Sequence, residues 1–242
     1  MRGTRVGANW PEILLATLRI AMAVAAVIVS APPAIADDAM DAEQLVDRSR
    51  LAVESFMADP NMEAFRELLK RAKGVFIAPQ VLKGAFVIGA SGGSGVLLTR
   101  DEKTGGWGGP AFYTMGGLSF GLQAGGQASE VALLAMTERG VAAFQASSVK
   151  LGAEVGFAIG PLGAGAAAAS ANLSADIISY VRSGGLFVGM SVDGAVVATR
   201  DALNRAYYGK DVTPSDILIR REVRNPQANG LLELIAKAAA TK

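Results

Sequence analysis

The chain has 242 residues, of which 51% are hydrophobic and 19% are charged, and its formal net charge is +1. This composition excludes an intrinsically disordered polyampholyte, and the near-zero charge provides no global attraction to nucleic acid. Histidine and cysteine are both absent, which removes disulfides, thiolate nucleophiles, imidazole bases and Cys/His metal sites. We therefore predict a non-enzymatic protein with no metal and no cofactor.

The first 36 residues have the layout of a secretory signal peptide. Arg2, Arg5 and Arg19 precede the apolar run 20–29, and the small-residue site Ala34-Ile35-Ala36 follows it. We expect cleavage after residue 36, and a retained membrane anchor is the alternative. The removed segment holds three arginines and one glutamate, so the formal charge falls by two, from +1 to −1. The mature protein is expected in the periplasm or outside the cell, either free or peripheral on a membrane.

Two helices are expected before the first strand. From Asp41 apolar residues recur at helical spacing, and Asp59-Pro60-Asn61 ends the pattern. A second helix fits residues 62–72, with Asn61 as its N-cap and Gly74 just past its end. These helices are predicted to lead directly into a sheet.

Basic residues gather on the second helix and just beyond it. They are Arg66, Lys70, Arg71, Lys73 and Lys83. A helix end with several cations suits a phosphate-bearing lipid head group, so these five are the candidate lipid-binding residues. The alternative is a solvated helix face whose charge is balanced by neighbouring acids.

Short strand-like segments follow, separated by glycine-rich turns. The expected strands are 75–78, 85–90, 96–99, 112–120, 131–137, 141–144, 149–159, 177–181, 186–192 and 195–199. The strictest two-residue alternation runs over Val149–Ile159, and Thr137–Gly140 and Val192–Ala195 are typical of hairpin turns. Short connections predict mainly antiparallel pairing, and glycine inside strands predicts bends. We therefore predict an α+β fold with a mainly antiparallel, strongly curved or barrel-like sheet and flanking N-terminal and C-terminal helices.

The C-terminal region is expected to be helical again. Asp201–Tyr208 is predicted to form a helix that Gly209 ends, and Leu231–Ala239 has the pattern of a short amphipathic helix. The expected organisation is a signal peptide over 1–36, one domain over 37–222, and a C-terminal linker and helix over 223–242. Within that domain the leading helices span about 41–73 and the β-rich core spans about 75–200.

Two other chemistries lack the residue arrangement that they require. Glu130, Glu154, Asp176 and Asp193 lie in the strand-rich region, but nothing in their spacing pairs two carboxylates for hydrolysis. Gly163–Ala168 fits a loose G-x-G-x-x-A without the parallel strand, helix and acid that a dinucleotide site requires. A hydrolase that uses serine or an acid is retained only as a third hypothesis.

Five groups of residues resemble, in chain order, the signatures of the SYLF lipid-binding domain family. They are 72–77, 125–130, 149–153 with 160–163, 179–180 with 183–189, and 204–205 with 207–209. The resemblance covers about 41–219. It departs at Ala164, where the family commonly has a basic residue, so it gives little support to a head-group contact from that loop.

The resemblance implies a single β-rich domain with flanking helices that binds phospholipids. In eukaryotic members phosphoinositides are the best-known ligands, and some members bind and bundle actin. Our leading hypothesis is a non-enzymatic phospholipid-binding protein of the cell envelope that recognises anionic head groups through the basic residues 66–83. The expected partners are anionic phospholipids or a membrane surface, with no nucleic acid, no known protein partner, and no actin because of the signal peptide. The alternative is an envelope structural or protein-interaction module without lipid specificity.

Overall fold

The structure is a computed structural model that describes residues 35–85, 88–120, 125–162, 174–184, 186–188, 192 and 194–240. The chain divides into two units, Met1–Ile35 and Ala36–Lys242, and the fold described below is that of the second. The expected signal peptide therefore lies outside the described residues except for its last two positions. The glycine-rich segment from Gly163 and the residues Ala164 and Asp193 also lie outside them.

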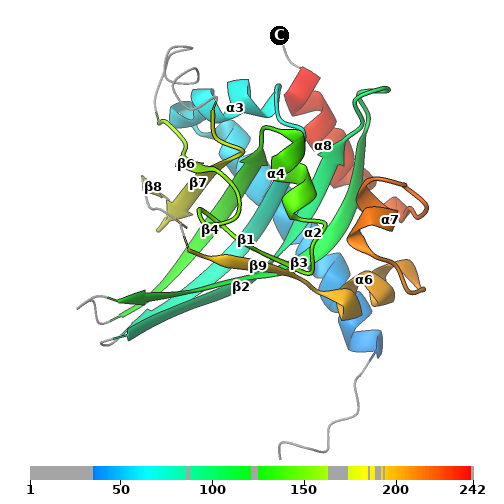
Figure 1. The fold of residues 1–242 in the computed structure, drawn as a ribbon, viewed down its shortest axis with the longest axis horizontal. Helices are drawn as coiled ribbons and strands as arrows, with labels where there is room; N and C mark the ends of the chain where they lie inside the picture. Colours follow the sequence, from blue (N-terminus) through cyan, green and yellow to red (C-terminus); the bar gives the residue numbers. More distant parts are fainter. Residues whose placement is uncertain are drawn as a thin grey trace, which may run out of the picture. The chain divides into compact units, whose positions relative to one another are not determined.

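One sheet forms the centre of the fold (Figure 1). Across the described residues its order is β5-β9-β3-β2-β1-β4-β7-β6, and β8 also pairs with β7. Every pair is antiparallel except β6 with β7. The strands are β1 (Gly74–Ala85), β2 (Ile88–Arg100), β3 (Trp107–Phe120), β4 (Gly125–Ala135), β5 (Ser148–Lys150), β6 (Phe157–Ile159), β7 (Ile177–Ser183), β8 (Leu186–Val188) and β9 (Val196–Thr199).

Helices flank this sheet at both ends of the described chain. They are α2 (Ile35–Ala58), α3 (Glu63–Leu69), α4 (Glu138–Ala143), α6 (Asp201–Tyr208), α7 (Pro214–Leu218) and α8 (Asn229–Ala240), with short 3₁₀ turns at Pro60–Met62 and Pro226–Ala228. The prediction of an α+β fold with a curved, mainly antiparallel sheet and flanking helices is confirmed.

The two faces of the sheet bury separate hydrophobic clusters. Strand alternation sends Val75 and Ile77 to the face covered by α2, α3 and α8, and sends Phe76 and Ala78 to the opposite face. Figure 1 shows α2 and α8 behind the sheet and α4 in front of it. Because both faces are covered, β1 and β3 are buried on both sides in their first halves, and their antiparallel partners β2 and β4 in their second halves.

Helix α2 packs on the sheet through one narrow seam. Its buried residues recur at three- and four-residue intervals and are Ala42, Leu45, Val46, Ser49, Ala52, Val53 and Phe56. Full burial of a side chain such as that of Phe56 contributes about 1.5–3 kcal/mol, which exceeds the intrinsic helix preference of any one residue. The opposite side of α2 stays exposed and carries Arg48 and Leu51.

Strand β1 is interrupted by a bulge at Pro79. The pairing with β2 runs from Gly74↔Thr99 to Ile77↔Val96 and resumes at Gln80↔Ser94, and the pairing with β4 shifts at the same place. Proline has no backbone N–H and cannot donate to a ladder, so a bulge is its usual position inside a sheet. The bulge bends β1 and re-aims the side chains beyond it.

Three predicted strands are wrong. The predicted strand 85–90 holds the end of β1 and the start of β2, which pair with each other at Ala85 and Gly89. Val141–Phe144 belongs to α4 and its C-terminal end, because the Thr137 side chain accepts a hydrogen bond from Gly140 N and caps a helix instead of starting a hairpin. Val149–Ile159 is not one strand but β5 and β6, joined by a tight turn. That turn includes Gly152 at a φ of 80° and an isolated bridge between Leu151 and Val155.

The predicted hairpin at Val192–Ala195 is also wrong. Gly194 has a φ of 78°, as a turn requires, but the strands on its two sides do not pair with each other. Strand β8 pairs with β7, whereas β9 pairs with β3 and β5. The turn therefore connects distant parts of the sheet, a relation that local turn chemistry cannot specify.

Candidate functional site

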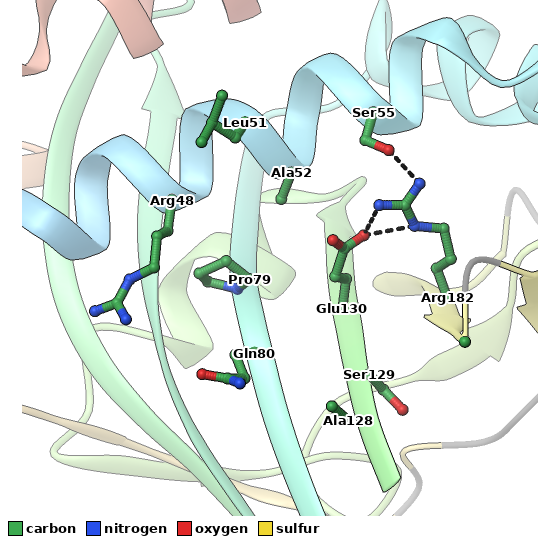
Figure 2. A pocket seen from close by; sticks show the side chains of 11 residues that line it. Arg48, Leu51, Ala52, Ser55, Pro79, Gln80, Ala128, Ser129, Glu130 and Arg182 are labelled. Atoms are coloured by element: carbon green, nitrogen blue, oxygen red, sulfur yellow. Dashed lines mark hydrogen bonds and ion pairs between the residues drawn. The ribbon is translucent and has the colours of Figure 1, made fainter.

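A cleft of about 450 Å³ lies between the exposed side of α2 and the sheet beyond the β1 bulge. Its walls come from α2, β1, β4 and the end of β7 (Figure 2). The lining residues are Arg48, Leu51, Ala52, Ser55, Pro79, Gln80, Ala128, Ser129, Glu130, Arg182 and Gly184. We call this the α2 cleft. The bulge of β1 forms part of its wall through Pro79 and Gln80.

One end of the α2 cleft is closed by a hydrogen-bonded arginine. Arg182 Nε donates to Glu130 Oε2 at 2.6 Å, and another nitrogen of the guanidinium donates to Ser55 Oγ. The guanidinium carbon also lies 5.9 Å from the centre of the Phe56 ring. Figure 2 shows Arg182 reaching from β7 to both β4 and α2. Arg182 therefore holds the C-terminal part of α2 to the sheet.

The other end of the α2 cleft carries Arg48. Its Nε donates to the backbone oxygen of Gln44 at 3.3 Å, and no ion pair joins it to any residue that the structure describes. Three residues later Leu51 keeps 54% of its surface exposed at the edge of the same cleft. On β1, Leu82 follows Gln80 on the same side of the strand and is 56% exposed. A cationic end thus adjoins an apolar surface.

The sequence-predicted basic residues are divided by the structure. Arg66 donates from Nη1 to the backbone oxygens of Met57 and Asp59, at 3.1 and 2.8 Å, and so closes the turn after α2. Lys70 forms an ion pair with Glu67 on its own helix. Arg66 and Lys70 therefore have structural partners.

Lys73 is neutralised by two acids. Its Nζ donates to Glu102 and, at 2.9 Å, to Glu138, and the hydrogen bond to Glu102 is the main reason why the pKa of Lys73 is raised. Lys83 lies ten residues further along β1, which corresponds to about 33 Å of strand, and is half-buried. Arg71 is exposed and has no ion pair with the described residues. The five cations do not form one site.

The acids of the strand-rich region have structural roles where they are described. Asp176 accepts hydrogen bonds from Thr137 Oγ1 at 2.6 Å and Gly156 N at 2.9 Å, and the Thr137 bond is the main cause of its lowered pKa. Glu154 accepts from the backbone nitrogen of Lys150. Within the described ranges no three His, Cys, Asp or Glu side chains are grouped as a metal site, and no helix is long and apolar enough to cross a membrane.

Comparison with known proteins defines the family. The family model Ysc84, described as Las17-binding protein actin regulator, matches residues 116–238, about half of the chain. The chain belongs to the Ysc84 (SYLF) family. This membership confirms the resemblance that its motifs indicated.

The relatives of this Ysc84-family chain include animal and yeast proteins. It is 34% identical over 170 residues to the bovine SH3 domain-containing YSC84-like protein 1, which covers 69% of this chain and 49% of the relative. It is 35% identical over 177 residues to Protein YSC84 of Saccharomyces cerevisiae, which covers 71% of this chain and 37% of the relative. A yeast LAS seventeen-binding protein 3 is 36% identical over 166 residues, or 67% of this chain and 36% of the relative. The chain therefore spans less than half the length of these relatives.

The names of these relatives correct one expectation. They describe binding and regulatory proteins, not enzymes, and the family description refers to actin regulation. The prediction that actin is not a partner is wrong. It relied on the expected signal peptide, although the family resemblance implied that some members bind actin.

Sequence reasoning missed most of the α2 cleft. Arg48 and Leu51 lie on a helix face whose sequence pattern is typical of a solvent-exposed surface. Glu130 was considered only as a catalytic acid, and that role was rejected. An arginine followed three residues later by a leucine, Arg48 and Leu51, was the available sign of a binding site on α2. This pair points to a site only when the structure shows that β1 lies across the cleft from it.

Proposed function

We propose that this Ysc84-family chain is a non-enzymatic phospholipid-binding protein and that the α2 cleft is its lipid contact. The observation that carries the proposal is the exposed Arg48, without an ion pair among the described residues, beside the exposed apolar side chain of Leu51. An arginine guanidinium is a strong donor to phosphate oxygens, and the neighbouring leucine gives an acyl chain an apolar contact.

The expected affinity for an isolated lipid is modest. A basic residue near an anionic surface contributes about 1 kcal/mol. Burial of the exposed half of Leu51 contributes on the order of 1 kcal/mol, and Leu82 contributes a similar amount if the acyl chain extends along β1. Together these terms support weak, reversible binding to a membrane surface, and tighter binding would require many lipids at once.

Recognition of anionic head groups by the basic residues 66–83 stays a prediction. Arg71 is the member best placed for it, because it is exposed and has no ion pair among the described residues, whereas Lys70 and Lys73 already have acidic partners. Location in the cell envelope likewise stays a prediction, and it depends on the N-terminal segment.

A second candidate function is binding to an actin-related protein partner. It is favoured by the description of the family as Las17-binding actin regulators and by the name of the yeast LAS seventeen-binding protein 3. The two functions are compatible, since a protein can meet a membrane and a partner through different surfaces.

Vesicle flotation tests the lipid proposal. Residues 37–242 should float with vesicles that contain phosphatidylethanolamine and phosphatidylglycerol, and Arg48→Glu should reduce the bound fraction several-fold. Arg224→Glu is the matched control, because Arg224 is exposed, lies outside the cleft lining and undergoes the same change of charge. Equal loss in both variants would indicate non-specific electrostatics. A folded parent that floats with no vesicle would refute the proposal.

The same experiment tests the hypothesis that the basic residues 66–83 bind the lipid. The triple variant Lys70→Glu, Arg71→Glu and Lys73→Glu should float almost as well as the parent if the α2 cleft is the main contact. Complete loss of flotation in a folded triple variant, with Arg48→Glu unchanged, would move the lipid site to the end of α3.

A further inference from the structure

Glu130 lies at the end of the α2 cleft opposite Arg48, and its hydrogen bonds with the described residues use only one of its carboxylate oxygens. Arg182 pairs with Oε2 through both Nε and Nη2. Oε1 has no hydrogen bond within the part of the chain that the structure describes, and Figure 2 shows it on the side of Glu130 away from Arg182. A carboxylate has about four acceptor positions, so a second donor can bind without displacing Arg182.

The α2 cleft therefore presents opposite charges at its two ends. Arg48 and Ser55 are seven residues apart on α2, which is about 10 Å along the helix axis. Ser55 marks the Glu130 end, because Arg182 donates to both residues. The nitrogens Nη1 and Nη2 of Arg48 have no hydrogen-bond partner among the described residues. A cationic donor and an anionic acceptor thus line the same cleft.

We propose that the α2 cleft selects phospholipids whose phosphate carries a primary ammonium group, as in a phosphoethanolamine head group. The phosphate accepts hydrogen bonds from Arg48, and the ammonium donates to Glu130 Oε1. Two charge-assisted hydrogen bonds of about 2.8 Å and an extended arm of roughly 5 Å between the phosphate oxygen and the nitrogen span about 11 Å. This span is close to the separation of Arg48 and Ser55 along the α2 axis, and the inference rests on the proposed phospholipid binding.

Other head groups satisfy only part of this arrangement. Phosphoglycerol reaches Arg48 with its phosphate but offers no positive charge to Glu130. Phosphocholine has the positive charge, but its nitrogen carries no N–H that can donate to Oε1. Because one charge-assisted hydrogen bond distinguishes these ligands, the preference is expected to be about tenfold in affinity.

Calorimetric titration of the full chain with monomeric dihexanoyl lipids tests the inference. The parent should bind dihexanoyl-phosphatidylethanolamine about tenfold more tightly than the phosphatidylglycerol and phosphatidylcholine analogues. Glu130→Gln keeps an acceptor for Arg182 and removes the charge, so it should lose this preference mainly through weaker phosphatidylethanolamine binding. Glu233→Gln on α8 is the matched control, since Glu233 is exposed and lies outside the cleft lining. It should keep the parent's preference.

The outcomes separate this inference from the proposed function. Binding of all three lipids with equal affinity, or an unchanged preference in a folded Glu130→Gln, would overturn the head-group selectivity and leave phospholipid binding in place. Binding of none of the three would refute both. If Glu130→Gln does not fold, the comparison of the three lipids on the parent still decides, because it requires no substitution.

Discussion

Replacement of Arg182 by methionine tests the contact that closes the α2 cleft. Methionine keeps much of the aliphatic packing but removes the guanidinium that joins Glu130, Ser55 and the Phe56 ring. Side-chain exposure is 18% for Arg182 and 28% for Glu130, so the pair is only partly screened by water. We take the lower part of the usual 1.5–3 kcal/mol for the charge-assisted bond and about 0.5–1 kcal/mol for the cation–π contact. The expected loss in free energy of unfolding is about 2–3 kcal/mol.

Urea unfolding measures this loss. With a slope near 2 kcal/mol per molar urea, the midpoint of Arg182→Met should fall by about 1–1.5 M at an unchanged slope. Arg139→Met is the control, because Arg139 is 72% exposed and pairs with Asp176 only at 3.8 Å. It should cost less than about 0.5 kcal/mol. A double-mutant cycle with Glu130→Gln should give a coupling energy of about 1–2 kcal/mol. A loss for Arg182→Met no larger than that of the control would refute the assigned role.

Three further predictions concern the core and pH. Tyr180→Phe should leave stability unchanged or raise it by about 1 kcal/mol in thermal unfolding, because the buried Tyr180 hydroxyl has no hydrogen-bond partner in the described part of the chain; a clear loss would indicate a partner. Gly160→Ala should cost about 1–3 kcal/mol or more, since its Cβ would lie 2.3 Å from the Tyr180 ring; unchanged stability would contradict this packing. The lowered pKa of Asp176 gives stability that is fully present above its unfolded value of 3.8 and is lost as pH falls through the folded pKa. Asp176→Asn should therefore flatten the acid limb of stability against pH, and an unchanged limb would contradict the assignment.

Helices with local signals could be predicted closely from the sequence. Asp201–Tyr208 is helical over the predicted residues, and it ends at Gly209 because glycine adopts the left-handed conformation there, with a φ of 68°. The break at Pro60 likewise separates α2 from α3 as expected. These features depend on a few neighbouring residues, which the sequence contains in full.

Features that depend on distant partners could not be predicted in this way. Thr137–Gly140 has turn chemistry, but the Thr137 side chain caps α4 and also donates to Asp176, 39 residues away in the chain. The alternation over Val149–Ile159 is real, yet β5 pairs with β9 and β6 pairs with β7. A two-residue period indicates that one face of a strand is apolar, but it does not indicate which element packs against that face.

The candidate site shows the same limit more strongly. Five cations that are close in the sequence separate in space, because Lys83 lies ten residues beyond Lys73 along an extended strand, a path of up to about 33 Å, and acids neutralise Lys73. The residues of the α2 cleft come instead from α2, β1, β4 and β7, which meet only in the folded sheet. The charge pattern along the chain therefore grouped cations that do not form one site. It did not indicate that Glu130 lines the α2 cleft together with Arg48.

Mapping of photo-crosslinks is the most direct test of lipid binding in the α2 cleft. A phosphatidylethanolamine with a diazirine on one acyl chain would be irradiated with the protein, and the modified peptides would be identified by mass spectrometry. We expect labels on Leu51 and Ala128 or their immediate neighbours, and loss of these labels in Arg48→Glu. Labels confined to the α3 end of the molecule around Arg71, and unaffected by Arg48→Glu, would contradict it.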